Sequence, residues 1–334
     1  MTRTSFFLLA GATALSVVAA AATLTFDRTA PAVAAAGERL FPGLETSAGD
    51  IARLTFREGD FEAVIERRDG VFVDAASGYP VDTETLQEIV GALTLAEIAE
   101  AKTTDPARHA DLGLAALDAE DGAGSEIVLE NGAGETIAHV IAGDRDFTLG
   151  GISGGQYVRR GGEDATWLAR VRIDPPTRRS GWFDTRLFET EAEDIVAASL
   201  TPAEGAPLQF ARDGADFLLE VSLPEGTTPR DSQIARIPRL FATLDFDDVR
   251  AASDAAETGI RLSAETAEGV TITLISLESE ADDSATWVRI GVEGSTDAAR
   301  ALAARVDGVE FALPNADAQV LEWSLDDLTE TAES

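Results

Sequence analysis

Short runs of alternating hydrophobic and polar residues, not long helical stripes, dominate the chain from residue 51 onward. Residues 51–56 and 61–65 alternate in this way, and the Glu-Gly-Asp turn at 58–60 between them is typical of a β-hairpin. Residues 71–73 resume the pattern after an Asp-Gly pair. The folded part of the chain is therefore predicted to begin with three successive antiparallel strands.

A helical pattern follows these strands. Hydrophobic residues recur with helical spacing at Leu86, Ile89, Val90 and Leu93. With Asp82 as the N-cap, this spacing predicts an amphipathic helix with one buried stripe. We expect a further strand at 95–101, and then a short helix that Asp105-Pro106 opens and that stops near Gly113.

The same order of elements recurs from residue 195. Strands are predicted at 195–200, 208–210 and 217–221, followed by a helix with Asp231 as its cap. Its hydrophobic residues are Ile234, Ile237, Leu240, Phe241 and Leu244. Pro238 lies inside this predicted helix and should kink it, because proline removes a backbone donor and crowds the preceding turn.

The two halves can be aligned by placing Leu93 on Leu244. That alignment puts Ile98 on Val249, and it gives Asp105 and Gly113 counterparts in Asp254 and Gly259. Each half also carries an Ala-Thr-Trp strand, with the tryptophan at 167 and at 287. The sequence therefore predicts an α+β fold, a tandem repeat of antiparallel-sheet units that each have one main amphipathic helix.

The N-terminal segment differs from everything that follows. After Arg3 there are 23 uncharged residues, from Thr4 to Phe26. As a helix they would span about 34 Å, which is enough for a bilayer core of about 30 Å. The segment is either a retained anchor or a signal peptide cleaved among its alanines, and both place the body outside the cytoplasm. The predicted parts are an apolar helix at 1–26, a tether at 27–39, repeat units at 40–185 and 186–330, and an acidic tail at 331–334.

Composition narrows the classes of function. Among 334 residues, 26 are basic and 60 acidic, which gives a formal net charge of −34. A body with this charge repels phosphates, so nucleic acid is not an expected partner. Because the chain has no cysteine, disulfides, thiol catalysis and zinc–thiolate sites are excluded. We expect no cofactor.

Motifs that could carry chemistry are weak. Residues 151–155 match G-x-S-x-G, but a strand follows them where a nucleophile elbow needs a helix, and no histidine comes after the serine. His109 is expected to be exposed and His139 to lie on or beside a buried sheet face with a hydrogen-bond partner, and no third ligand completes a metal pair. The acidic clusters at 118–121, 245–248 and 278–283 lack calcium-loop spacing. No catalytic or metal site is predicted.

One stretch reverses the charge of the chain. From residue 158 to 186 there are seven arginines and four acidic residues, a local net charge of +3. The candidate partner-docking residues are Arg159, Arg160, Arg170, Arg172, Arg178, Arg179, Trp182 and Arg186. These arginines either dock an acidic partner or headgroups, or pair with acidic residues of the other repeat and fasten the two repeats together.

Several short motifs resemble one family. They are LFPGL at 40–44, GYPVD at 78–82, EAKT at 100–103, Asp-Pro at 105–106, LGL at 112–114, YVR at 157–159 and WFDTRL at 182–187. In these motifs the chain is similar to the family called domain of unknown function 4340. The resemblance implies a bacterial envelope protein with one N-terminal membrane segment, often encoded beside ABC-type transporter components and gliding-motility-type auxiliary proteins. It implies no catalytic residues.

These observations favour a non-catalytic envelope accessory or scaffolding protein, with an ABC-type transport complex in the membrane as its partner. It would be anchored in the inner membrane with a periplasmic body, or periplasmic if the segment is cleaved. A free periplasmic ligand-binding protein is the alternative, and an acid-residue hydrolase is a remote one. An N-terminal segment that stays attached would favour the first, because a tether raises the effective concentration at a membrane complex.

Overall fold

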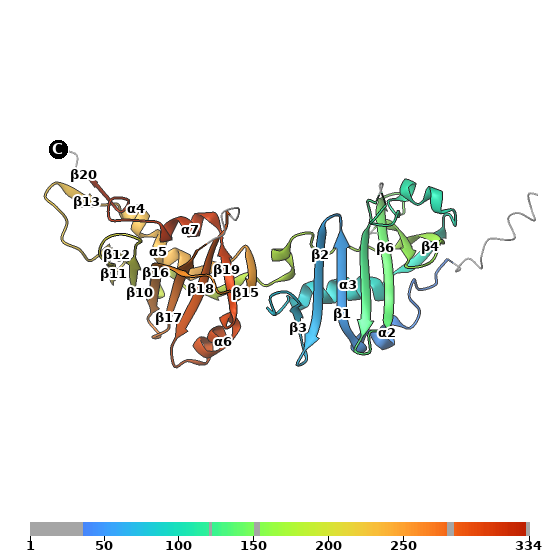
Figure 1. The fold of residues 1–334 in the computed structure, drawn as a ribbon, viewed down its shortest axis with the longest axis horizontal. Helices are drawn as coiled ribbons and strands as arrows, with labels where there is room; N and C mark the ends of the chain where they lie inside the picture. The colour runs from blue at the N-terminus through green and yellow to red at the C-terminus, as the bar shows by residue number, and fades with distance from the viewer. Residues whose placement is uncertain (1–35, 120–121, 150–153, 279–283, 332–334) are drawn as a thin grey trace, which may run out of the picture. The chain divides into compact units, whose positions relative to one another are not determined.

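The computed structural model describes residues 36–119, 122–149, 154–278 and 284–331 (Figure 1). The predicted apolar helix at 1–26 lies outside these residues. Among the described residues, strands hold 42% and helices 21%, so the fold is mostly β with few helices, within the predicted α+β class. The chain divides into two compact units. The first contains the described residues up to Glu62 together with Gln87–Pro175, and the second contains Ala63–Leu86 and the residues from Pro176 onward.

The first sheet has eight strands in the order β3-β2-β1-β5-β6-β7-β8-β4. Their bounds are β1 Ile51–Glu58, β2 Phe61–Arg68, β3 Val71–Asp74, β4 Glu97–Ala101, β5 Ser125–Asn131, β6 Thr136–Asp146, β7 Gly155–Arg160 and β8 Thr166–Arg170. The pairs are antiparallel, with Arg57 opposite Glu126 on β1 and β5 and Ile141 opposite Arg159 on β6 and β7. The predicted strands at 51–56, 61–65 and 71–73 are thus confirmed as β1, β2 and β3.

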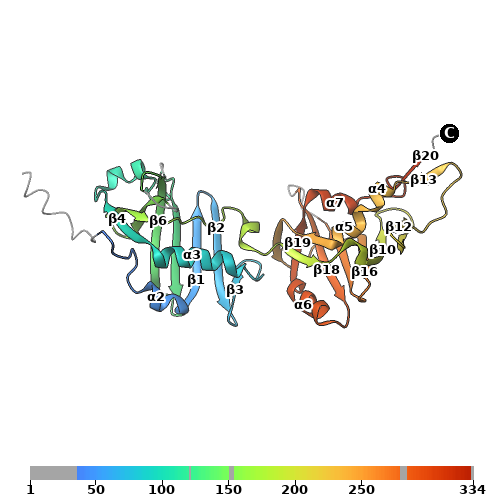
Figure 2. The ribbon, with the colours of Figure 1, turned by 180° about the vertical axis from the view of Figure 1, so that it is seen from behind.

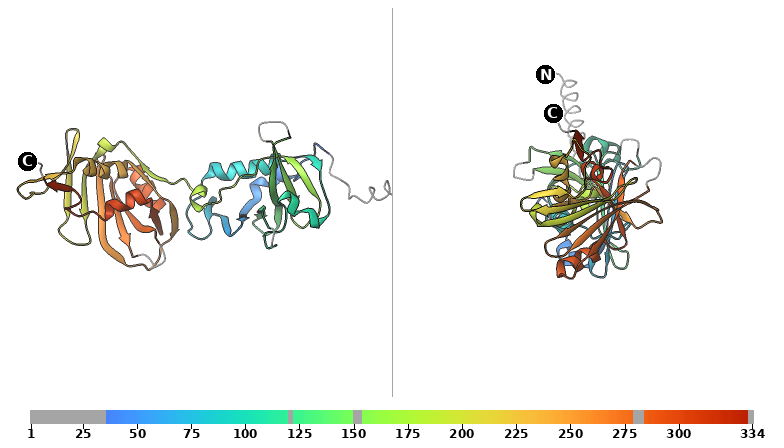
Figure 3. Two further views of the ribbon diagram at one scale, coloured as in Figure 1. Left: turned by 90° about the horizontal axis from the view of Figure 1, so that it is seen from above. Right: turned by 90° about the vertical axis from the view of Figure 1, so that its left-hand side faces the viewer.

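Helix α3 (Thr83–Leu95) connects β3 to β4, which lie at opposite edges of the first sheet. It begins where predicted, because the Asp82 carboxylate accepts the backbone N–H groups of Glu84 and Thr85. The helix crosses one face of the sheet. It lies behind β1 in Figure 1 and in front of β1 in Figure 2, and in the left view of Figure 3 the helix lies above the strands. Leu93 is completely buried. The predicted apolar stripe is therefore part of the core.

Short helices precede β1 and lie between β4 and β5. They are α2 Leu44–Ser47, η2 Ala48–Asp50, η3 Pro106–Arg108 and η4 Ala110–Leu112. The predicted short helix at Asp105-Pro106 is present as η3 and η4, and Gly113 ends it with a φ of 67°.

The second sheet, in the second unit, has eight strands in the order β12-β11-β10-β16-β17-β18-β19-β15. Their bounds are β10 Ile195–Thr201, β11 Leu208–Asp213, β12 Asp216–Leu219, β15 Asp248–Ala251, β16 Glu257–Thr266, β17 Thr271–Leu277, β18 Thr286–Glu293 and β19 Val309–Leu313. Two small ribbons pair β9 (Arg186–Glu189) with β14 (Thr243–Asp245), and β13 (Thr227–Pro229) with β20 (Thr329–Thr331). The described helices of this unit are η5 Arg179–Trp182, η6 Ala192–Asp194, α4 Asp231–Ile234, α5 Arg236–Ala242, α6 Asp297–Val306 and α7 Asn315–Leu321.

Pro238 divides the predicted second helix. Helix α4 ends at Ile234, four residues before the proline, and α5 begins at Arg236. Because a proline ring crowds the carbonyl four residues earlier, one continuous helix cannot form here, and the expected kink is a break.

Three details of the predicted alignment were wrong. Leu244 lies in β14, because the helix ends at Ala242. Gly259 lies in β16 and ends no helix, since the chain is already paired with β17 from Glu257. Trp167 and Trp287 lie in β8 and β18, which hold different places in their sheets, the seventh and the sixth. Hydrophobic spacing and a shared tripeptide matched these residues, but neither shows where a helix ends or which strand of a sheet a residue enters.

Candidate functional site

A cavity of about 310 Å³ lies in the first unit, on the sheet face that carries Arg57. Four neighbouring strands supply all of its ionisable residues except Asp118, namely Arg57 on β1, Glu126 on β5, His139 on β6 and Arg159 on β7. Side chains alternate along a strand, so the cross-strand pairs Arg57–Glu126, Glu126–Ile141 and Ile141–Arg159 all point to this face. Ala116, Leu117 and Asp118, from the loop after η4, complete the lining.

Glu126 is the acid at the centre of this cavity. Its Oε2 accepts Arg57 Nη1 at 3.2 Å, and its Oε1 accepts His139 Nε2 at 2.7 Å. Gly161 makes room for the imidazole, because a Cβ at that position would come within 1.7 Å of His139 Nδ1. The hydrogen-bond partner expected for His139 is therefore Glu126, and both oxygens of this carboxylate are already engaged.

Arg159 is the unusual member of the cavity. Its Nη1 and Nη2 donate to the backbone carbonyls of Glu163 and Leu114, at 3.2 and 3.3 Å. Its Nε is buried and has no acceptor in the part of the chain that the structure describes. No described carboxylate lies within ion-pair distance of its guanidinium. A guanidinium that meets only neutral oxygens is a natural site for an anion.

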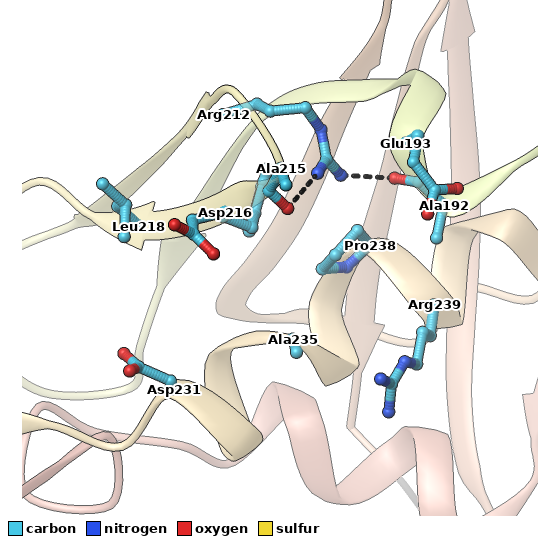
Figure 4. Close-up of a pocket in the computed structure, with 11 residues that line it drawn as sticks. Ala192, Glu193, Arg212, Ala215, Asp216, Leu218, Asp231, Ala235, Pro238 and Arg239 are labelled. Carbon is cyan, nitrogen blue, oxygen red and sulfur yellow. Dashed lines mark hydrogen bonds between the residues drawn. The ribbon is translucent and has the colours of Figure 1, made fainter.

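A second cavity of about 310 Å³ lies in the second unit (Figure 4). The β11–β12 hairpin and helices α4 and α5 line it, and Arg212 lies at its upper side. The Arg212 guanidinium is already committed, since it donates to the carbonyls of Ala192, Ile195 and Ala215. Asp231 and Arg239 at the rim are exposed, and solvent screens their charges. This cavity offers a ligand weaker electrostatic recognition than the first.

The second sheet also contains a closed charged network around Glu310, which is completely buried. Arg250 Nε lies 2.9 Å from one carboxylate oxygen and Arg289 Nη2 lies 2.8 Å from the other, while Ser253 donates its backbone N–H. Burial acts to raise the pKa of Glu310, but the hydrogen bonds from Ser253, Arg250 and Arg289 hold it below its ordinary value. Both carboxylate oxygens of Glu310 are therefore engaged within the chain.

The residues proposed for docking are divided between the two units. In the first unit, Arg160 donates to the Leu40 carbonyl and stacks over Trp167, whereas Arg170 pairs with Glu97 and Arg172 with Asp174. Arg159 is the only one of the eight candidates that lines either of the two cavities.

The remaining candidates lie in the second unit. Arg179 binds Asp74 at 3.0 Å and Asp248 at 2.9 Å, and Arg186 binds Asp245 at 2.9 Å. Trp182 is buried and donates to the Pro176 carbonyl. Arg178 is exposed, and its guanidinium makes no hydrogen bond or ion pair to any described residue. Most of the charge in this stretch is therefore balanced within the chain.

Tyr79 is a structural residue that the sequence analysis missed. It is buried and meets the rings of Phe183, Phe246 and Phe311 edge-on, at centroid distances of 5.5 to 5.6 Å. Arg305 Nε donates to its hydroxyl at 2.6 Å. Burial, opposed by this arginine, raises the pKa of Tyr79 to about 12. The GYPVD motif at 78–82 supplies this tyrosine, but its partners lie more than 100 residues away in the sequence.

Other expectations can be compared with the structure. His109, expected to be exposed, is 5% exposed, because its Nε2 bonds the Asp164 carbonyl. No group of three or more His, Asp or Glu side chains among the described residues is placed to hold a metal ion. Within the same residues, no helix has the length and hydrophobicity needed to cross a bilayer.

Two eight-stranded antiparallel sheets, each with a helix-containing connection between its two edge strands, define the chain as a mostly-β protein of the α+β class. The sequence model of the family Domain of unknown function (DUF4340) matches residues 72–261, which is more than half of the chain. The chain therefore belongs to this family, as its motifs indicated. Neither the curated proteins nor the solved structures contain a match to it.

Proposed function

We propose that the chain is a non-catalytic accessory or scaffolding protein of the bacterial envelope, built by tandem duplication of one sheet unit. The observation that carries the duplication is the strand order, which is the same in the two sheets when their strands are matched in sequence. The ladders β1–β5 and β10–β16 also have an irregularity at the same place, directly after their first residue pair. A duplicated platform suits a scaffold, because two linked surfaces can hold two partners at high effective concentration.

The envelope location rests on the uncharged segment from Thr4 to Phe26 and on membership of the family. We infer that this segment is retained as an anchor and that the partner is an ABC-type transport complex in the same membrane. Apolar burial, and not charge, would hold such an anchor. The full chain should therefore stay with the membrane fraction through washes with high salt and with carbonate.

Purification from native membranes tests this function. A tagged full chain should bring transporter components with it, whereas a chain with residues 1–26 replaced by a cleavable signal peptide should retain far less of them. Recovery of a soluble mature form that begins between Ala20 and Glu38 would contradict the anchor. If the chain without this segment retains all of its partners, the accessory role is contradicted.

Two adjacent arginines allow the docking hypothesis to be tested with a matched control. Arg178 is exposed, whereas Arg179 joins Asp74 and Asp248 within the second unit. If an acidic partner docks here, Arg178→Glu should abolish co-purification without changing the melting temperature, because an exposed charge contributes little to stability. Arg179→Glu should instead lower the melting temperature, since it leaves a buried aspartate uncompensated. An intact complex with the stable Arg178→Glu variant would exclude docking at this position.

A free periplasmic ligand-binding protein is the second candidate, and the cavity around Arg159 favours it. The two candidates differ in one observable. A ligand-binding protein that acts alone would be released from the membrane by signal cleavage and would still bind its ligand, whereas the proposed scaffold depends on its anchor.

A further inference from the structure

Corresponding positions of the two sheets each carry an arginine. We count along the strands from the irregularity that follows the first pair of the β1–β5 and β10–β16 ladders. By this count, Ile141 on β6 corresponds to Ile275 on β17. Arg159 pairs with Ile141, and Arg289 pairs with Ile275. The two arginines therefore hold the same place in two sheets of the same strand order.

Their surroundings differ in the acidic groups that each arginine meets, since Arg289 lies 2.8 Å from a Glu310 carboxylate oxygen and 3.9 Å from one of Glu257, whereas Arg159 donates to backbone carbonyls. Arg289 binds the buried carboxylate of Glu310 on the next strand. Arg159 lies opposite Thr166 on its own next strand, and that hydroxyl is already used, since it accepts the Thr103 N–H and donates to the Thr103 carbonyl. Ser253 donates its N–H to Glu310 in the same way that Thr103 donates to Thr166. In the first sheet a hydroxyl thus stands where the second sheet has a carboxylate.

We propose that the cavity around Arg159 binds a small carboxylate ligand, which acts on Arg159 as Glu310 acts on Arg289. A partly buried guanidinium that meets only neutral oxygens is stabilised when a carboxylate arrives, because charge-assisted hydrogen bonds to it are about twice as strong as neutral ones. This inference goes beyond the scaffolding function and does not depend on it.

The cavity also limits the kind of carboxylate. A volume of about 310 Å³ is at the lower end of ligand pockets, so the ligand has few atoms. Leu117 and Ile141 provide apolar walls, Asp118 is an exposed residue of the lining, and Arg57 and His139 lie beside a Glu126 whose oxygens are both engaged. A short aliphatic dicarboxylate matches this lining: one carboxylate would bind Arg159, the methylene groups would contact the apolar walls and the second carboxylate would lie near Arg57.

Calorimetric titration of the full chain in detergent micelles tests the site. The probes are succinate, acetate and inorganic phosphate, each added at constant ionic strength set with chloride. We expect saturable binding of succinate, weaker binding of acetate, and weaker binding of phosphate than of succinate. Arg159→Gln should weaken succinate binding at least tenfold, since it removes the charge that recognises the carboxylate. Arg172→Gln is the matched control, because that arginine is exposed and pairs with Asp174 outside the cavity, and it should bind succinate as the wild type does.

A second variant keeps the test decisive if Arg159→Gln fails to fold. Ala116 lines the cavity from an exposed loop, so Ala116→Phe fills the space and leaves every charge in place. It should abolish succinate binding with little change in melting temperature. The proposal is overturned if succinate does not bind at concentrations up to about 10 mM, if Ala116→Phe binds it as well as the wild type does, or if phosphate binds more tightly than succinate. Because the readout is ligand heat, failure here is distinct from failure of membrane retention.

Discussion

The helical segments that connect the edge strands differ between the two sheets. In the first sheet, the 13-residue helix α3 runs unbroken from its Asp82 cap and leads to an edge strand. In the second, the connection is divided into α4 and α5, followed by the extra strand β14. The strand order is the same in both sheets. The connection therefore has to cover an apolar face and reach the opposite edge, and it need not be one regular helix.

A second contrast concerns charge. The second sheet closes its arginines around Glu310, whereas the first leaves Arg159 among neutral oxygens. Two sheets with the same strand order can thus differ in whether the chain itself supplies a carboxylate for an arginine at a given position.

Core truncations should have the largest effects. Leu93 in α3 and Phe241 in α5 are both completely buried. Leu93→Ala should lower the free energy of unfolding by about 2–5 kcal/mol, and Phe241→Ala by about 3–5 kcal/mol, because each leaves a cavity. Urea denaturation followed by tryptophan fluorescence measures both. A loss below about 1 kcal/mol in either would show that its helix does not carry the core of its sheet.

Removing the buried acid should affect the second sheet more than the equivalent change affects the first. Glu310→Gln removes the buried negative charge that Arg250 and Arg289 share, and we expect a loss of about 2–4 kcal/mol, below the full cost for buried pairs because both arginines are about one-third exposed and Arg289 also meets Glu257. Thr166→Val should cost about 1–2 kcal/mol, through the unpaired Thr103 N–H. Urea denaturation of both variants checks this order, and equal losses would contradict it.

The same carboxylate gives the expected response to acid. Because the folded pKa of Glu310 lies below its ordinary value of 4.5, its contribution to stability is present above that value and is lost as the pH falls through the folded pKa. The Glu310→Gln variant should therefore lose less stability on acidification than the wild type does.

The two tyrosines should titrate separately. Tyr79 is buried and its pKa is raised to about 12, whereas Tyr157 is more open, and burial together with Asp146 raises its pKa. Since a raised tyrosine pKa favours the neutral folded form, Tyr79 contributes stability below pH 10.0 that is lost as the pH rises through 12, about 3 kcal/mol in all. Ultraviolet absorbance of tyrosinate should show two steps, and Tyr79→Phe should remove the later one. A single step shared by both residues would contradict the burial of Tyr79.

The smallest effect is expected at the break between α4 and α5. Pro238→Ala restores a backbone donor and removes the ring that crowds Ile234. The free energy of unfolding should change by less than about 1 kcal/mol, because the gain in helix propensity is offset by the higher conformational entropy of the unfolded chain without proline. Helical content by circular dichroism should rise slightly as α4 and α5 join. Unchanged helicity would mean that packing, and not Pro238, separates them.

Local features could be predicted from the sequence. The hairpin of β1 and β2, the Asp82 cap and the stop at Gly113 each depend on a few adjacent residues. The error at Leu244 arose because hydrophobic spacing alone does not show where a helix ends. His109 was misplaced because its burial depends on a carbonyl 55 residues away.

The candidate site could be predicted only in part. Arg159 was selected for its charge and His139 for its phase, but nothing in the sequence placed them in one cavity with Arg57 and Glu126. Four strands with separate registers bring these side chains together. Likewise, the pairing of Arg179 with Asp74 and Asp248 depends on long-range folding that charge counting does not reveal.

The position of β4 determines how the chain must assemble. In the first sheet β3 and β4 are the edge strands, and in the second β12 and β15 are. Four strands that come later in the sequence, β5–β8 or β16–β19, lie between the edge strand β4 or β15 and the rest of the sheet. During synthesis, both edge strands of a sheet therefore leave the ribosome before the four strands that connect them. The first residue pair of the β1–β5 ladder joins Ile51 to Asn131, and that of the β10–β16 ladder joins Ile195 to Thr266. Closing such distant contacts is slow, so each sheet should fold late and as a whole. A fragment cut at residues 72 and 261 would begin inside β3 and end inside β16, and it would leave each sheet without strands it needs.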